Sequence, residues 1–200
     1  MNAESMREGL RKISRRMDES REYLIQLDQQ NGDGDLGVSM SEGFRAAAAC
    51  MEETGETDLG KLLMKAGSAF NEAAPSSLGT ILSFGFMGMA KALKGKEEAD
   101  AKQFAAALKA GVEKIMDKAG SKPGEKTILD ALCPAVDAFV AAEDFPEALR
   151  LAAKAAADGS EATRQMRSVH GRAAYYGEQS IGLLDGGSVV GRLIFEALAQ

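Results

Sequence analysis

The chain is poor in the residues that build disulfide frameworks, zinc sites and rigid turns. Among 200 residues it has no tryptophan, one histidine, two cysteines and four prolines. Cys50 and Cys133 lie far apart and form no CxxC pair. We therefore expect two reduced structural thiols rather than a disulfide framework. With a single histidine and no paired cysteines, the chain also lacks the ligands of a zinc site.

Two further absences bear on partners and location. No apolar run approaches the roughly 20 residues that span a bilayer, so we expect no membrane association. Residues 1–16 are charged throughout and lack the apolar core of a signal peptide. The net charge is −6 and no basic stripe is present, which argues against nucleic acid as a partner. These features predict a cytoplasmic protein.

What is present is a succession of helical patterns. Hydrophobic residues make up 45% of the chain, apolar positions recur with helical spacing, and no segment alternates as a strand would. We predict an all-α fold in which residues 1–200 form a single domain, an antiparallel, barrel-like bundle of about eight helices. The expected helices cover residues 5–29, 41–53, 58–73, 78–94, 99–119, 125–142, 145–169 (with a bend at Gly159) and 188–198.

The most informative stretch is the loop of residues 28–40. Asp28, Asp33 and Asp35 place three carboxylates within eight positions, and Gly32 and Gly34 allow the backbone to turn tightly between them. Carboxylates this close repel one another unless a cation lies between them. Hard cations such as Mg²⁺ prefer oxygen ligands. We interpret the loop as a divalent-metal site.

The pattern of this loop also matches three other kinds of loop. Gly32, Gly34 and Gly37 match the dinucleotide-binding pattern GxGxxG, but that pattern follows a strand, and here a helical pattern precedes it. An EF-hand Ca²⁺ loop from Asn31 to Glu42 is an alternative, although Leu36 stands where that loop requires glycine. A solvated acidic turn between helices is the third.

Other loops offer weaker signals. Ser76 and Ser77 begin a helix, whose N-terminus suits either a phosphate or an ordinary serine cap. Arg172 suits a forked phosphate contact or an ion pair. His170 is the only histidine, and we expect it on the surface or ion-paired.

These motifs together resemble the nucleotide-binding L subunit, or domain, of dihydroxyacetone kinases. The resemblance covers essentially the whole chain. Its most specific part is the loop Asp28-x-x-x-x-Gly-Asp-Gly-Asp-x-Gly-x-x-Met40. The other matches are the helix start at Ser76-Ser77, the run Pro123-Gly124-Glu125-Lys126-Thr127-Ile128-Leu129-Asp130-Ala131-Leu132, the run Gly171-Arg172-Ala173-Ala174-Tyr175, and Asp185-x-Gly187.

The resemblance implies a subunit of a glycerol-metabolism kinase that phosphorylates a small keto-sugar, a triose or tetrose. It implies that Asp28, Asp33 and Asp35 bind two Mg²⁺ ions that bridge the phosphates of ADP or ATP and so serve catalysis. It also implies a partner, the K-type subunit that holds the sugar through a histidine. A homodimer is a further assembly that the interpretation leaves open. The nucleotide pocket would be formed by Leu36, Gly37, Val38, Ser39, Ser76, Ser77, Gly120, Ile128, Arg172, Asp185, Gly186 and Gly187.

The chain departs from the family pattern at three positions. Leu36 and Ser39 stand where the family usually has histidine and asparagine, and Gly186 stands where it usually has proline. Fewer polar contacts and a looser loop favour faster nucleotide release. We therefore expect a kinase that exchanges free ATP, with recharging by a phosphotransferase-system donor as the alternative. A non-catalytic, nucleotide-sensing partner protein is a second functional hypothesis.

Overall fold

The protein is helical from end to end in the computed structural model, which describes all 200 residues. Nine α-helices and two 3₁₀ helices follow one another, and the only extended pairing is an isolated bridge between Asn2 and Glu98. The all-α prediction is confirmed. None of the helices combines the length and the apolar character that crossing a membrane requires.

The helices group into two compact units. Residues 1–15 and 39–119 form the first unit, and residues 16–38 and 120–200 form the second. The single domain expected for residues 1–200 stays a prediction. The elements are α1 (Ala3–Glu19), α2 (Arg21–Asp28), α3 (Leu36–Glu53), α4 (Leu59–Ala73), α5 (Ser77–Ala92), α6 (Ala101–Ala119), α7 (Leu129–Ala141), α8 (Phe145–Ala162), η1 (Thr163–Gln165), η2 (Arg172–Ser180) and α9 (Gly186–Leu198).

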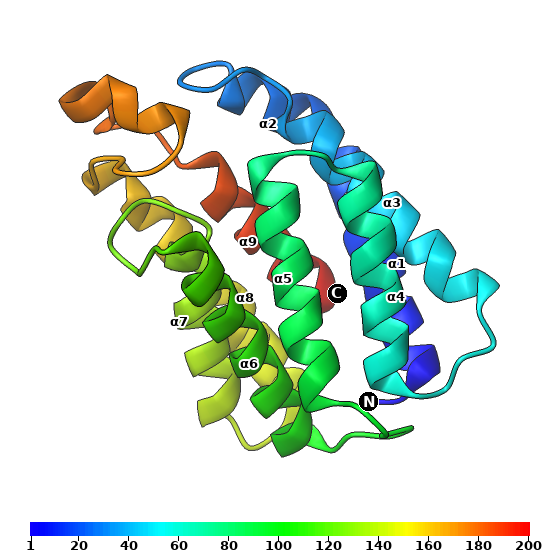
Figure 1. Cartoon of the computed structure of the whole chain (residues 1–200). Coiled ribbons are helices and arrows are strands. Elements are labelled where there is room, and N and C mark those ends of the chain that lie inside the picture. Colours follow the sequence, from blue (N-terminus) through cyan, green and yellow to red (C-terminus); the bar gives the residue numbers. More distant parts are fainter. The chain divides into compact units, whose positions relative to one another are not determined.

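In the first unit, α5 packs against α4 on one side and α6 on the other (Figure 1). Phe70 of α4 is fully buried, and its ring lies 4.8 Å from that of Phe44 and 5.7 Å from that of Phe86. Glycines bring α5 and α6 close together, because a Cβ at Gly88 would lie 2.5 Å from the Ala110 carbonyl oxygen. The core therefore combines aromatic packing with close approach of helix backbones.

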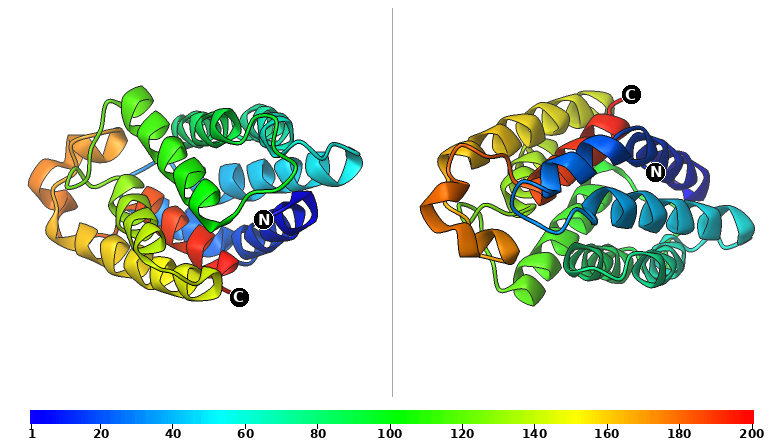
Figure 2. Two further views of the ribbon diagram at one scale, coloured as in Figure 1. Left: turned by 90° about the horizontal axis from the view of Figure 1, so that it is seen from below. Right: turned by 90° about the horizontal axis from the view of Figure 1, so that it is seen from above.

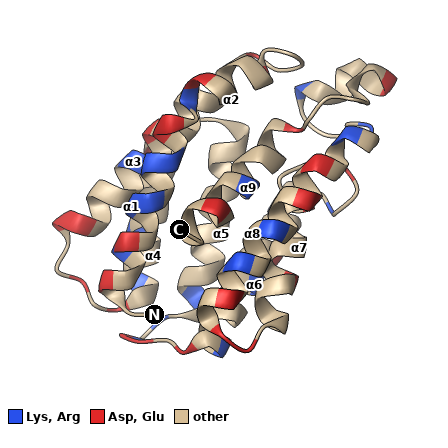
Figure 3. Cartoon of the chain, turned by 180° about the vertical axis from the view of Figure 1, so that it is seen from behind, with Lys and Arg blue, Asp and Glu red and all other residues tan.

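In the second unit, α7, α8 and α9 pack on one another, as the views in Figure 2 show for the yellow-green, yellow and red helices. Gly159 of α8 lies directly on α7: a Cβ there would be 2.0 Å from the Asp130 carbonyl oxygen. Ser160 and Ser188 share a buried hydrogen bond of 2.9 Å between α8 and α9. Blue and red segments of the ribbon mark charged residues along α8 (Figure 3), and Arg150, Lys154 and Asp158 of this helix are exposed.

Four of the expected helix boundaries need correction. The predicted helix 5–29 divides at Ser20, where ψ is 1°, into α1 and α2. The helix expected from residue 41 begins at Leu36, directly after Gly34 completes the turn with φ +80°. The helix expected from residue 125 begins at Leu129, because Lys126 is in the left-handed region with φ +60°. The helix expected over residues 145–169 has no bend at Gly159, and it ends at Ala162, where η1 follows.

Candidate functional site: an acidic loop in the second unit

The acidic loop, residues 28–35, brings three carboxylates together as the sequence predicted. Oxygens of Asp28, Asp33 and Asp35 lie within 4.8 Å of one another. Asp28 ends α2, and its Oδ2 accepts a hydrogen bond of 2.7 Å from the Gly34 N–H. Gly32 has to be glycine, since a Cβ there would lie 2.2 Å from Asp28 Oδ1. The glycines thus allow the backbone to wrap around the Asp28 carboxylate.

The electrostatics of the acidic loop favour a cation. Asp33 and Asp35 are exposed and Asp28 is partly buried. Burial is the main cause that raises the pKa of Asp35, and repulsion from Asp33 and Asp28 raises it further. Three carboxylates held this close carry an unfavourable interaction that a divalent cation would relieve. Their hard oxygen donors are the ligands that Mg²⁺ and Ca²⁺ prefer.

Arg172 is the one cation that meets this loop. Its Nη2 lies 2.8 Å from Asp33 Oδ2, and both side chains are largely exposed. Arg172 opens η2, directly after Gly171 with φ +62°. The side chain of Tyr175 in the same element is 92% exposed. Arg172 is therefore ion-paired, and it belongs to the same cluster as the predicted metal ligands.

The start of α9 gathers several predicted nucleotide-pocket residues. Asp185 caps the helix, with Oδ2 accepting a 2.6 Å hydrogen bond from the Ser188 N–H. Burial raises the pKa of Asp185 to about 7, and the nearby carboxylates of Asp130 and Asp28 also raise it. A Cβ at Gly187 would be 3.3 Å from the Ile128 nitrogen, and a Cβ at Gly186 would be 2.6 Å from Leu36 Cδ2. Leu36, Ile128 and residues 185–187 thus form one neighbourhood.

The remaining predicted pocket residues have local contacts of their own. Ser39, Ser76 and Ser77 belong to the first unit, where Ser39 Oγ donates a 2.7 Å hydrogen bond to Ser76 Oγ. Ser76 caps α5 by accepting from the Gly79 N–H at 3.1 Å. Gly37 and Val38 continue the first turn of α3, and a Cβ at Gly37 would lie 2.1 Å from the Arg21 carbonyl oxygen. Gly120 follows α6 with φ +60°.

Two buried charges of the second unit escaped the sequence analysis as functional groups. Lys126 is 3% exposed, and Asp130 is 5% exposed. Asp130 accepts hydrogen bonds from the N–H groups of Gly124 at 2.5 Å and Thr127 at 2.7 Å. Burial lowers the pKa of Lys126, an effect that Asp185 partly opposes. No periodic pattern signals a buried lysine, since most lysines are exposed.

His170 contacts an acidic side chain, and this contact is an ion pair when the imidazole is protonated. Its Nε2 lies 2.6 Å from Glu125 Oε2. The hydrogen bond from His170 is the main cause that lowers the pKa of Glu125. The pair links the turn before α7 to the loop before η2.

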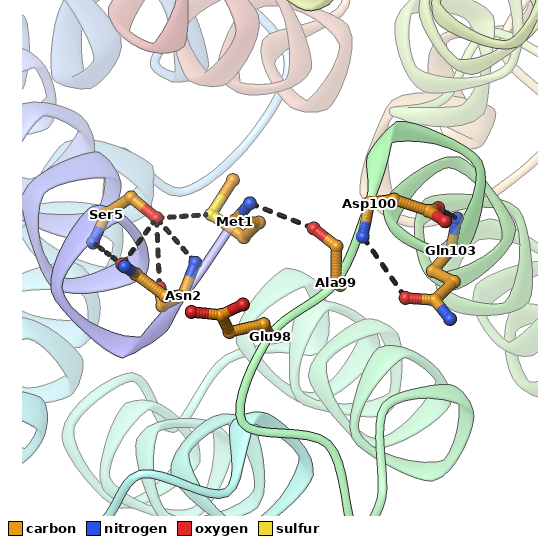
Figure 4. A pocket seen from close by; sticks show the side chains of 7 residues that line it. All are labelled: Met1, Asn2, Ser5, Glu98, Ala99, Asp100 and Gln103. Atoms are coloured by element: carbon orange, nitrogen blue, oxygen red, sulfur yellow. Dashed lines mark hydrogen bonds between the residues drawn. The ribbon is translucent and has the colours of Figure 1, made fainter.

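A separate pocket lies in the first unit (Figure 4). It is lined by Met1, Asn2, Ser5, Glu98, Ala99, Asp100 and Gln103. The Ser5 and Asn2 side chains bond to one another, and Gln103 Oε1 accepts from the Asp100 N–H at 3.1 Å. Because its polar groups bond to one another and none belongs to the predicted site, we assign this pocket no role.

Comparison with known proteins decides the family. The family model described as the DAK2 domain matches residues 30–200. The chain belongs to the DAK2 domain family. The match includes Asp33 and Asp35, and it begins two residues after Asp28. The predicted resemblance to the L subunits of dihydroxyacetone kinases is thereby confirmed.

Individual relatives agree with this assignment. The DAK2 domain is 32% identical over 191 residues to the PEP-dependent dihydroxyacetone kinase 1, ADP-binding subunit DhaL, of Listeria innocua, covering 96% of this chain and 92% of that protein. It is also 32% identical over 181 residues to the L-erythrulose 1-kinase of Mycolicibacterium smegmatis. That match covers 88% of this chain but only 32% of the longer kinase.

A solved structure supports the fold. The native form of the dihydroxyacetone kinase of C. freundii superimposes with a TM-score of 0.80 at 24% sequence identity, covering all of this chain and 34% of that one. The same kinase in complex with AMP-PNP and Mg²⁺ gives a TM-score of 0.78 over 96% of this chain. At this identity the likeness concerns the fold alone.

Proposed function

We propose that this DAK2 domain is the nucleotide- and Mg²⁺-binding phosphotransferase subunit of a small keto-sugar kinase. The acidic loop is the observation that carries the proposal, because its three converging carboxylates form only one ion pair, that of Asp33 with Arg172. ADP-binding subunits among its relatives support the same conclusion. The substrate class is a triose or tetrose, since the relatives include dihydroxyacetone and L-erythrulose kinases.

Asp28, Asp33 and Asp35 hold two Mg²⁺ ions in this proposal. Their fit rests on donor chemistry: the carboxylates supply hard oxygens, and burial together with repulsion from Asp33 and Asp28 raises the pKa of Asp35. When bound, the ions neutralise phosphate charge and orient the phosphoryl group for in-line transfer. The carboxylates need to be ionised for this role, and the same ions would keep them so.

The chain's own residues orient the nucleotide. Arg172 is already held by Asp33, so its guanidinium lies where phosphate charge is expected and can form a forked contact. Leu36 and Ile128 supply apolar surface beside the first turn of α9, with Gly120, Gly37 and Val38 completing the proposed lining. Ser76 and Ser77 begin α5 and Ser39 of α3 bonds to Ser76, and these three hydroxyl groups are also proposed to contact the nucleotide.

A partner subunit holds the sugar. The only histidine in the chain, His170, is already paired with Glu125, so no candidate remains here for a covalent histidine anchor of a keto-sugar. We propose a K-type subunit for that role. A homodimer of this chain and a phosphotransferase-system donor remain proposals about assembly and phosphoryl supply, as does location in the cytoplasm.

The Ca²⁺-loop alternative fits the geometry less well. The EF-hand template would run from Asn31 to Glu42, with the metal ligands spread along a 12-residue loop. In this chain α3 begins at Leu36, so half of that loop is helical. Asp28, which lies before the template, belongs to the acidic cluster instead.

Calorimetric titration of the purified chain with ADP and ATP tests the metal-dependent binding. We expect binding in Mg²⁺ that EDTA abolishes, and we expect Asp33→Ala and Asp35→Ala to weaken nucleotide affinity by about 100-fold or more. Asp144→Ala is the control, since Asp144 caps α8 outside the acidic loop. Nucleotide affinity that is unchanged in EDTA would refute the proposal, and Ca²⁺ binding without nucleotide would favour the EF-hand alternative.

The partner and the phosphoryl donor can be tested together. We expect no turnover with ATP and dihydroxyacetone until a K-type subunit is added, whereas a nucleotide-sensing protein would stay inactive even then. We propose free ATP as the donor, because Leu36 and Gly186 offer the nucleotide few polar contacts. Mass spectrometry of protein purified without added nucleotide is the measurement. Stoichiometric ADP that survives dialysis would contradict ATP exchange and favour the phosphotransferase-system donor.

A further inference from the structure

The buried ammonium of Lys126 is surrounded by backbone carbonyl groups. Nζ donates hydrogen bonds to the carbonyl oxygens of Thr163 at 2.9 Å, Met166 at 3.2 Å, Ser180 at 2.7 Å and Leu183 at 2.6 Å. We name this arrangement the Lys126 cage. No carboxylate bonds to the ammonium in the cage, so carbonyl dipoles alone replace its hydration. Rings of carbonyl oxygens solvate K⁺ in channel filters in the same way.

The Lys126 cage joins both ends of one loop. Thr163 and Met166 precede η2, whereas Ser180 and Leu183 follow it. The intervening loop carries Arg172, which pairs with Asp33 of the acidic loop. Two residues beyond Leu183, Asp185 caps α9, and its N–H donates to Thr163 Oγ1 at 3.1 Å. A single side chain therefore closes the base of the loop that presents Arg172 and leads into α9.

The backbone at Lys126 is strained in order to place this ammonium. Lys126 is the only non-glycine residue with positive φ, at +60°. Left-handed backbone is unfavourable for a residue with a Cβ, and it persists where the surrounding contacts over-determine it. The neighbouring N–H of Thr127 is held by Asp130, which fixes the turn from the other side. The strained turn and the cage together aim the side chain inward.

We propose that Lys126 is a positioning residue, a tethered monovalent cation whose charge holds residues 163–185 in the conformation that presents Arg172 and Asp185 to a nucleotide. The part concerning nucleotide rests on the proposed function. The part concerning the loop does not, because the cage is complete without any ligand. Removal of the charge should loosen the loop whether or not a nucleotide binds.

Limited trypsin digestion tests the loop without nucleotide. Cleavage at Arg164, Arg167 and Arg172 should accelerate about tenfold or more in Lys126→Met, which keeps most of the side-chain volume but removes the ammonium. Lys122→Met is the matched control: it removes the same charge from an exposed position in the same turn and should cleave at the wild-type rate. Wild-type cleavage rates in Lys126→Met would overturn the proposal.

Chemical rescue separates charge from packing. In Lys126→Ala, n-propylammonium supplies the deleted methylenes and ammonium, and it should restore protection from trypsin. The isosteric alcohol n-propanol and the bulky tetramethylammonium ion, at equal concentration, should not. Equal rescue by n-propanol would show that volume matters rather than charge. Equal rescue by tetramethylammonium would show an effect of ionic strength, and either result overturns the proposal.

Failure of the proposed function and failure of the proposed role of Lys126 give different results. If wild-type protein fails to bind Mg·ADP while the trypsin results hold, the proposed function fails and the cage stands. If wild-type protein binds and Lys126→Met keeps both its affinity and its protection, the cage fails alone. When both hold, Lys126→Met weakens Mg·ADP affinity about tenfold or more, and n-propylammonium restores it in Lys126→Ala. If Lys126→Ala does not fold without an additive, its refolding yield is measured in n-propylammonium and in n-propanol. A higher yield in n-propylammonium supports the role of the charge, and equal yields overturn it.

Discussion

The acidic loop and the Lys126 cage lie in the same unit, and they differ in how their charges are satisfied. In the cage one buried ammonium faces four carbonyl oxygens, and the nearby Asp130 carboxylate accepts two backbone hydrogen bonds. In the acidic loop three carboxylates face one another, and Arg172 forms an ion pair with only one of them. A buried charge whose hydrogen bonds are all made within the fold serves the structure. Carboxylates that face other carboxylates indicate a bound ligand of opposite charge.

The largest expected effect separates Asp130 from Asp33. Asp130→Ala leaves the N–H groups of Gly124 and Thr127, in two part-buried hydrogen bonds, without an acceptor, and we expect it to lower the free energy of unfolding by about 2–4 kcal/mol. Asp33→Ala relieves repulsion and loses only an exposed ion pair, so without metal it should change stability by less than about 1 kcal/mol. Urea denaturation in EDTA measures both. An Asp33→Ala variant as unstable as Asp130→Ala would erase the distinction between the two regions.

The next prediction concerns pH and Asp185. The pKa of Asp185 is raised from 3.8 to about 7, so between these values the folded protein binds a proton that the unfolded chain does not. The free energy of unfolding should therefore fall with rising pH across this window, by at most about 1.4 kcal/mol per pH unit from this group. Asp185→Asn keeps a helix-capping side chain and should remove this slope.

Urea denaturation of wild type and Asp185→Asn from pH 4 to about pH 8 checks the slope. Asp144→Asn is the control, because Asp144 caps α8 in the same manner from an exposed position. Equal slopes in the wild type and Asp185→Asn would contradict the raised pKa.

The smallest expected effect on stability belongs to Arg172. Its ion pair with Asp33 is exposed, so Arg172→Ala should cost less than about 1 kcal/mol of stability. Mg·ADP affinity should nevertheless fall about tenfold, because a charged hydrogen bond to phosphate is lost. Arg167→Ala, which removes an exposed pair with Glu178, is the control. Equal affinities for the two variants by calorimetry would assign Arg172 a structural role only.

Much of the fold followed from short-range patterns. Helical periodicity predicted the all-α class, and the caps at Asp58, Ser76 and Asp144 occur where the sequence signals them. Two of the helix starts that failed, Leu36 and Leu129, lie close to the left-handed residues Gly34 and Lys126. The sequence does not reveal that Lys126 has positive φ, because the contacts around this turn, the carbonyl groups at its ammonium and Asp130 at the Thr127 N–H, form only in the folded chain.

The candidate site divides in the same way. The acidic loop was predictable because its three carboxylates are close in sequence, so that their spacing alone indicates a metal site. The structure brings those three carboxylates together. The neighbourhood of Leu36 with Gly186 depends on how α3 meets α9, and no local pattern reports it. The Arg172–Asp33 pair likewise joins positions 139 residues apart, a contact that only the folded chain defines.

The close contact of Gly159 with the Asp130 carbonyl oxygen sets limits on motion within the second unit. If α8 moved along its axis by one residue and turned by the matching rotation of about 100°, the Cβ of Asp158 or Ser160 would take the place of Gly159 and clash with that oxygen. This screw motion is therefore blocked as a mode of conformational change in this pair. Amide groups of α7 and α8 should exchange hydrogen only through global unfolding, while those of residues 166–180 exchange through local opening. The α7–α8 pair thus serves as a fixed support for the loop that carries Arg172.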